Sequence, residues 1–197
     1  MREQSYATEV ERLLDQVRDY LGDGDDAKLV EANLIVNRAL QLRPESVEGW
    51  LLKCQIASAI GDDLAALAAV EMALGSQQRT SSRGPMASFG GPISELIGPP
   101  EALYWRAVVL GDLGRHREAL SSIEAALRSL GDEPHWLLEE LFYEKVSLLD
   151  TLGLHDLASA THAAGLERCP GSALLRAAVA PTYAAPRPRL KVLRGGA

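Results

Sequence analysis

The residues able to do chemistry are few and widely spaced. The four histidines stand at positions 116, 135, 155 and 162, and the two cysteines at 54 and 169. His155 and His162 would lie two turns apart on a helix, roughly 10 Å, which is too far for both to bind one ion. A zinc site or a disulfide framework needs cysteines at shorter, repeated spacings. We therefore expect no metal site, no disulfide framework and no cofactor.

The sequence also lacks the arrangements by which enzymes activate a nucleophile or hold a phosphate. It has no glycine-rich phosphate loop after a strand, no His-Glu-x-x-His pair and no serine in a nucleophile elbow. Asp23, Asp25 and Asp26 stand like the start of a calcium loop, but Leu34 occupies the position of the bidentate glutamate. A catalytic site needs several converging groups, so we predict that the protein is not an enzyme.

Composition and charge favour a helical protein that binds neither nucleic acid nor membrane. Alanine and leucine are abundant, and both lose little entropy in a helix. The net charge of -7 would repel phosphates, and no apolar run approaches the roughly 20 residues that span a bilayer. The N-terminus shows no signal-peptide pattern, which predicts a cytoplasmic protein. Arginine outnumbers lysine sixteen to four, a composition typical of a GC-rich, bacterial genome.

Small residues recur in pairs with a spacing of seven. The pairs are Ala32 and Ala39, Ala66 and Ala73, Ala119 and Ala126, and Ala158 and Gly165. Five residues before three of the pairs stand Gly61, Gly114 and Gly153, and prolines follow the first and last pairs at Pro44 and Pro170. Small residues two turns apart let another helix approach one face, glycine can adopt φ > 0 where a helix ends, and proline ends a helix. The pattern predicts stacked, antiparallel helix pairs.

This pattern resembles the tetratricopeptide repeat (TPR) family over about residues 10–170. The second copy carries it through Trp50, Cys54, Gly61, Ala66, Val70 and Ala73. The sequence departs from the family at Lys53, Arg106 and Lys145, where leucine is usual, and at His162, where an aromatic residue is common. The resemblance implies an all-α solenoid of about four units. We expect helices at 5–21, 26–42, 45–60, 62–75, 100–113, 115–130, 134–152, 154–168 and 172–179. A stretched turn, LGDGDDAK, follows the first of them.

Two segments interrupt or follow the repeats within a predicted helical domain at 1–180. Residues 76–99 are rich in glycine, serine and proline and read as a long loop. Its PISELI stretch is expected either to pack on the helices as a short helical turn or to belong to a mobile linker. Residues 181–197 contain four bases and no acid. We expect a disordered, solvated tail, with contact to a phosphate or an acidic surface as the alternative.

The resemblance also implies where a partner would bind. In this family the concave groove is lined by the first helix of each unit, which here gives the candidates Leu51, Gln55, Tyr104, Trp105, Val108, Tyr143 and Ser147. Some members hold a C-terminal carboxylate with cationic and amide side chains, but the matching positions here are Leu52, Trp105 and Glu144. Aromatic residues favour apolar partner segments. The alternative is that Tyr104 and Trp105 simply pack beneath the long loop.

These observations predict an adaptor or scaffold that binds a peptide or helix of a protein partner in the groove of the last two units. Replacing Tyr104 and Tyr143 by alanine should then weaken binding without unfolding the protein. By analogy alone, a chaperone for secreted bacterial proteins is an alternative. A self-assembling module, giving a homo-oligomer, is another: it requires that the short last helix leave the apolar end of the solenoid open.

Overall fold

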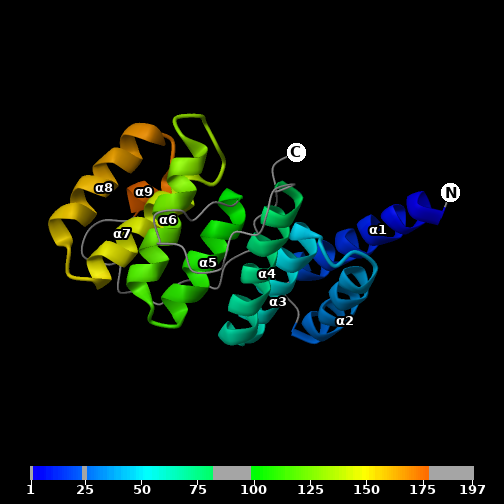
Figure 1. Ribbon diagram of the computed structural model, residues 1–197. Coiled ribbons are helices and arrows are strands. Elements are labelled where there is room, and N and C mark those ends of the chain that lie inside the picture. Colours follow the sequence, from blue (N-terminus) through cyan, green and yellow to red (C-terminus); the bar gives the residue numbers. More distant parts are fainter. Residues whose placement is uncertain (1, 24–25, 82–98, 178–197) are drawn as a thin grey trace. The chain divides into compact units, whose positions relative to one another are not determined.

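The computed structural model describes residues 2–23, 26–81 and 99–177, and this part of the chain consists of helices joined by short turns (Figure 1). Its elements are α1 (Arg2–Asp23), α2 (Asp26–Leu42), α3 (Val47–Ile60), α4 (Asp63–Ser81), α5 (Pro100–Asp112), α6 (His116–Leu130), α7 (Leu138–Thr151), α8 (His155–Arg168) and α9 (Ala173–Ala177). No helix in these ranges is long and apolar enough to cross a membrane. The predicted all-α class is therefore confirmed.

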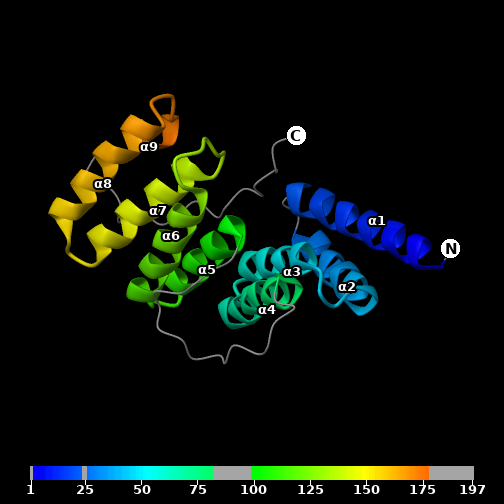
Figure 2. The ribbon, with the colours of Figure 1, turned by 45° about the horizontal axis from the view of Figure 1, so that its top comes forward.

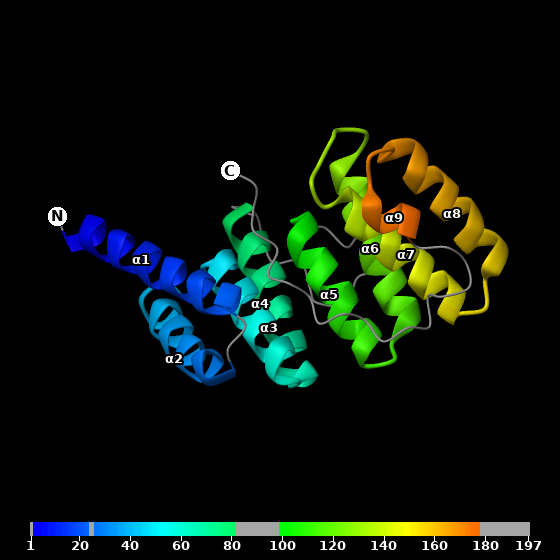
Figure 3. The ribbon, with the colours of Figure 1, turned by 180° about the vertical axis from the view of Figure 1, so that it is seen from behind.

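The helices belong to two compact units, and each unit contains two antiparallel pairs. In unit 1, α1 pairs with α2 and α3 with α4, while α2 also packs on α3. In unit 2, α5 pairs with α6 and α7 with α8, while α6 also packs on α7. Figures 2 and 3 show the pairs of each unit from two further directions. This sequential pairing is the arrangement of a TPR-type solenoid.

The first pair forms despite its stretched turn. One stripe of α1 is buried in unit 1, at Val10, Leu13, Leu14, Val17 and Leu21. Successive steps of three and four residues keep this stripe on one helix face. It meets buried residues of α2 and α3 in one continuous cluster. Burial of this stripe fixes α1 as the first helix of the first pair.

The small residues lie where helices meet. Ala32, Ala66 and Ala119 are 0% exposed and Ala158 is 5% exposed. Their partners seven residues on, at Ala39, Ala73, Ala126 and Gly165, are buried as well. A methyl or hydrogen at these sites lets backbones approach, which a larger side chain would prevent. The predicted role of the small residues in helix contact is confirmed.

Three turns share one glycine-dependent geometry. Gly61, Gly114 and Gly153 have φ values of 86°, 74° and 75°. In each turn the residue after the glycine donates its N–H to a carbonyl five residues earlier, at 2.9, 2.8 and 2.8 Å. This bond satisfies a carbonyl that the helix end leaves open. Because side chains disfavour positive φ, the sequence needs glycine at these three positions.

Two predicted boundaries are wrong. The helix expected to end at residue 75 continues as α4 to Ser81. Ser76 is 0% exposed, so packing overrides the low helix propensity of Gly75 and Ser76. The seventh helix begins at Leu138 rather than at 134, because the side chain of His135 accepts the N–H of Leu137 at 3.2 Å and holds the preceding turn. The rest of the predicted loop (82–98) and the basic tail (181–197) lie outside the described residues.

Helix α9 covers the end of the second pair in unit 2. It packs on α7 and α8 (Figure 3), and its Leu175 is 0% exposed in a cluster with Leu138 and Phe142. The ring of His162 also hydrogen-bonds to the carbonyl of Leu175, at 2.7 Å. The short last helix therefore caps this pair. Self-assembly stays a prediction, and Leu154 and Leu157 at the start of α8 are 43% and 56% exposed.

Candidate partner-binding site

The predicted groove residues are divided between the two units. Leu51 and Gln55 lie on α3 in unit 1, whereas the other five lie on α5 and α7 in unit 2. In both units these are first helices of a pair, as the resemblance implied.

Helix α5 is buried almost all round. Nine of its residues are buried, including every position from Ala102 to Trp105 and from Ala107 to Gly111. Tyr104, Trp105 and Val108 are 1%, 5% and 2% exposed. The two rings meet edge-on, with centroids 5.9 Å apart and planes at 70°. These three side chains are buried, so α5 leaves little of them accessible; the long loop beneath which Tyr104 and Trp105 could pack lies outside the described residues.

Helix α7 presents a less covered surface. Tyr143 is half-buried, whereas Ser147 and Glu144 are 9% and 6% exposed. The carbonyl of Ser147 accepts the hydroxyl of Thr151 at 2.8 Å, and both Tyr143 and Glu144 have interaction partners. Of the five candidates in unit 2, Tyr143 therefore offers the most accessible side chain.

Helix α3 holds a half-buried stripe in unit 1. Leu51, Gln55 and Ser58 follow one another at steps of four and three residues, which places them on one helix face, and all three are half-buried. The Oε1 atom of Gln55 is buried and has no hydrogen-bond partner. An unpaired buried acceptor is costly. This stripe therefore places the aliphatic side chain of Leu51 beside an amide oxygen, on Gln55, that accepts no hydrogen bond.

The three basic departures from the family have structural partners across helix pairs. Lys53 donates to Asn37 Oδ1 at 2.8 Å and lies 5.4 Å above the ring of Trp50. Arg106 donates to Ser122 Oγ at 2.7 Å, and Lys145 lies 3.3 Å from Glu124. Each base thus makes a polar contact at a position where leucine, usual in the family, would make an apolar one.

The histidines do not gather. His155 is 71% exposed, and its Nδ1 lies 2.6 Å from Oδ1 of Asp150. His116 is half-buried, and its Nδ1 is buried without a partner. In the residues that the structure describes, no three histidine, cysteine or acidic side chains could hold a metal ion. Cys54 is 0% exposed, and burial raises the pKa of its thiol to about 12.

The ionised form of the Glu140 carboxyl on α7 is disfavoured by burial. Its Oε2 is buried without a partner, and burial raises the pKa of this carboxyl, with a further rise from Glu139 and an opposing backbone hydrogen bond. A folded-state pKa above the ordinary one stabilises the fold fully at low pH, and this contribution is lost as the pH rises through the raised pKa. We expect Glu140→Gln to raise the thermal midpoint by about 1–2 °C at pH 7 and by nothing measurable at pH 4. Circular dichroism melts at both pH values test this.

Glu133 supplies the control for that experiment. It is exposed, in the turn before α7, so Glu133→Gln should leave the midpoint unchanged at both pH values. A Glu140→Gln protein that melts below the wild type at pH 7 would show that the carboxylate stabilises the fold, contrary to this account.

The fold is similar to those of two solved proteins. The crystal structure of the MamA protein matches 82% of this chain and 73% of its own, with a TM-score of 0.60 and 17% identity. The structure of YrrB, a TPR protein with an unusual peptide-binding site, matches 76% of this chain and 64% of its own, with a TM-score of 0.54 and 19% identity. The sequence matches no protein-family model and no curated protein. At such identities the likeness shows the fold, which is TPR-like.

Proposed function

We propose that this chain, whose fold is that of TPR-type helix pairs, is an adaptor that binds an extended segment of a protein partner. TPR folds generally mediate binding between proteins. YrrB is described as having a peptide-binding site. The proposal for this chain is therefore a peptide contact on the first helices of its pairs.

The surface that best supports this contact is the α3 stripe of Leu51, Gln55 and Ser58. The observation that supports this assignment is the Oε1 atom of Gln55, which is buried and accepts no hydrogen bond. The terminal torsion of glutamine is soft, so a small rotation would turn the amide outward. It would then accept a peptide N–H and donate to a peptide carbonyl. Leu51 supplies an apolar contact one turn away, and Tyr143 on α7 is the corresponding contact in unit 2.

To test this assignment, peptides that bind the full chain are selected from a displayed random library. Gln55→Leu keeps the size of the side chain but removes both hydrogen-bonding groups. We expect it to weaken the selected peptides about tenfold, the loss of a hydrogen bond or two at the interface. Binding is measured by calorimetry, with a thermal melt to show that the variant is folded.

Leu64→Ala provides a matched control in the same unit, because Leu64 on α4 is 72% exposed and lies outside the α3 stripe. Its affinity for the peptides should stay within about twofold of the wild type. Peptides that bind Gln55→Leu as tightly as the wild type would reject the α3 stripe as the binding site. A library that yields no peptide at all would reject the peptide-binding function.

A further inference from the structure

Three basic side chains that are far apart in sequence meet in a hollow of unit 2. The hollow has a volume of about 490 Å³ and lies between α6, the turn that follows it, α7 and α8. Its lining residues are Glu124, Leu127, Arg128, Gly131, Asp132, Lys145 and Arg168. Five of the seven are charged, and bases outnumber acids, in a chain whose net charge is -7. The hollow is therefore a locally basic site on an acidic protein.

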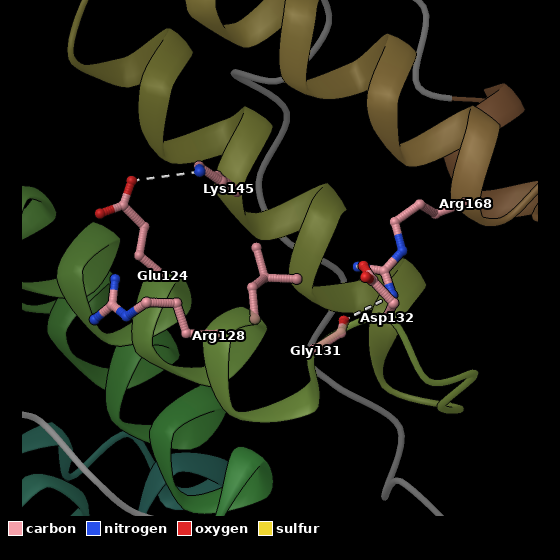
Figure 4. Close-up of a pocket in the computed structure, with 7 residues that line it drawn as sticks. Glu124, Arg128, Gly131, Asp132, Lys145 and Arg168 are labelled. Carbon is pink, nitrogen blue, oxygen red and sulfur yellow. Dashed lines mark hydrogen bonds and ion pairs between the residues drawn. The ribbon is translucent and has the colours of Figure 1, made fainter.

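The two acids of the hollow occupy only some of the N–H donors of its bases. Figure 4 shows Lys145 turned toward Glu124 at one end, and Arg168 turned toward Gly131 and Asp132 at the other. The Lys145–Glu124 contact is a single one of 3.3 Å, and Asp132 is fully exposed and 4.0 Å from Arg168. Lysine has three N–H donors and arginine five. Both bases therefore keep donors for a ligand.

Arg128 adds a charge that no described acid neutralises. It lies on the exposed side of α6, beside Glu124 in Figure 4, and no ion pair links it to any residue that the structure describes. The side chains of Lys145 and Arg168 are only 23% and 29% exposed, so water screens them less than it screens surface charges. Leu127, partly buried at the same hollow, offers an apolar contact.

We propose that this hollow binds an acidic peptide segment of a protein partner. Carboxylates of the peptide would pair with Arg128 and Lys145 at one end and with Arg168 at the other, displacing the weakly held Asp132. A dense phosphate is a poorer fit, because Glu124, Asp132 and the C-terminal carbonyls of α6 all lie at the hollow. Separate carboxylates can each take one base and avoid these acids. This site is independent of the α3 stripe in unit 1.

Binding of the blocked peptide acetyl-Glu-Glu-Leu-Glu-Glu-amide to the full chain is measured by calorimetry at low salt. We expect saturable binding that Arg128→Glu weakens at least about tenfold and that added salt weakens as well. The same peptide with lysine in place of glutamate should not bind. Gln55→Leu should leave the affinity unchanged, which separates this site from the proposed α3 contact.

Arg117→Glu is the matched control, since Arg117 is also exposed on α6 but does not line the hollow. It changes the net charge of the protein by the same amount and should leave the affinity within about twofold. Arg168→Gln, checked by a thermal melt, should weaken binding from the other end. Equal losses in Arg128→Glu and Arg117→Glu, absence of saturable binding, or a preference of the hollow for a single-stranded oligonucleotide would each overturn the proposal.

Discussion

Replacing Gly165 by valine is expected to destabilise unit 2 strongly. A Cβ atom on Gly165 would lie 3.0 Å from Cβ of Phe142 and 3.1 Å from Cδ1 of Leu175. Atoms at the base of Phe142 can move only if α7 moves, whereas Cδ1 is the far end of the Leu175 side chain and shifts more easily. Phe142 is 7% and Leu175 0% exposed, so neither has open space beside it. Overpacking of this kind costs about 1–3 kcal/mol, and valine adds two methyl groups to the clash.

The expected size of the change can be measured by urea unfolding. We expect Gly165→Val to lower the free energy of unfolding by about 3 kcal/mol and the thermal midpoint by roughly 6–12 °C. Gly165→Ala should lose less, because alanine regains up to about 1 kcal/mol of helix propensity over glycine.

Gly171→Ala is the control for the two Gly165 variants, because a Cβ there would meet nothing within 4 Å. It should change stability by no more than about 0.5 kcal/mol. If Gly165→Val were as stable as the wild type, α8 would not be held against Phe142 and Leu175 as this structure has it.

Replacing Tyr104 by alanine is expected to unfold or severely destabilise unit 2, contrary to the expectation from the sequence. Tyr104 is 1% exposed and is the largest of the fully buried side chains. Its ring also meets that of Trp105 edge-on. Removing a buried aromatic ring leaves a cavity and costs about 3–5 kcal/mol.

The measurement is again urea unfolding, followed by the fluorescence of Trp105 and Trp136 in unit 2. Tyr104→Phe keeps the ring and should cost only about 1–2 kcal/mol through loss of the hydroxyl. Tyr143→Ala removes a half-buried ring of the same size and should cost clearly less than Tyr104→Ala. A Tyr104→Ala protein as stable as the Tyr143→Ala protein would show that Tyr104 is a surface residue after all.

The two tyrosines mark the limit of what repeat position can predict. Both stand on the first helix of a pair, at equivalent places in the pattern, yet Tyr104 is in the core and Tyr143 is half-buried. Their helices have different surroundings: α5 is buried almost all round, whereas α7 leaves part of its face accessible. Position in a repeat determines which way a side chain points, but the elements that cover it determine whether a partner can reach it.

By itself, the sequence determined the helices, their pairing and their turns. These follow from local signals: small residues seven apart pack on one face, and glycine at 61, 114 and 153 permits the positive φ that each turn adopts. It also correctly predicted the absence of strands in the described residues, because alanine and leucine dominate the chain.

Only the tertiary structure decided which polar groups are paired, which are left unsatisfied and which come together. Arg128, Lys145 and Arg168 stand on three helices, and no spacing along the chain links them. The unpartnered Oε1 of Gln55 is equally invisible to a pattern of residues. The physical reason is that helix periodicity is a property of neighbours in the chain, whereas burial and charge contacts depend on how helices distant in sequence pack.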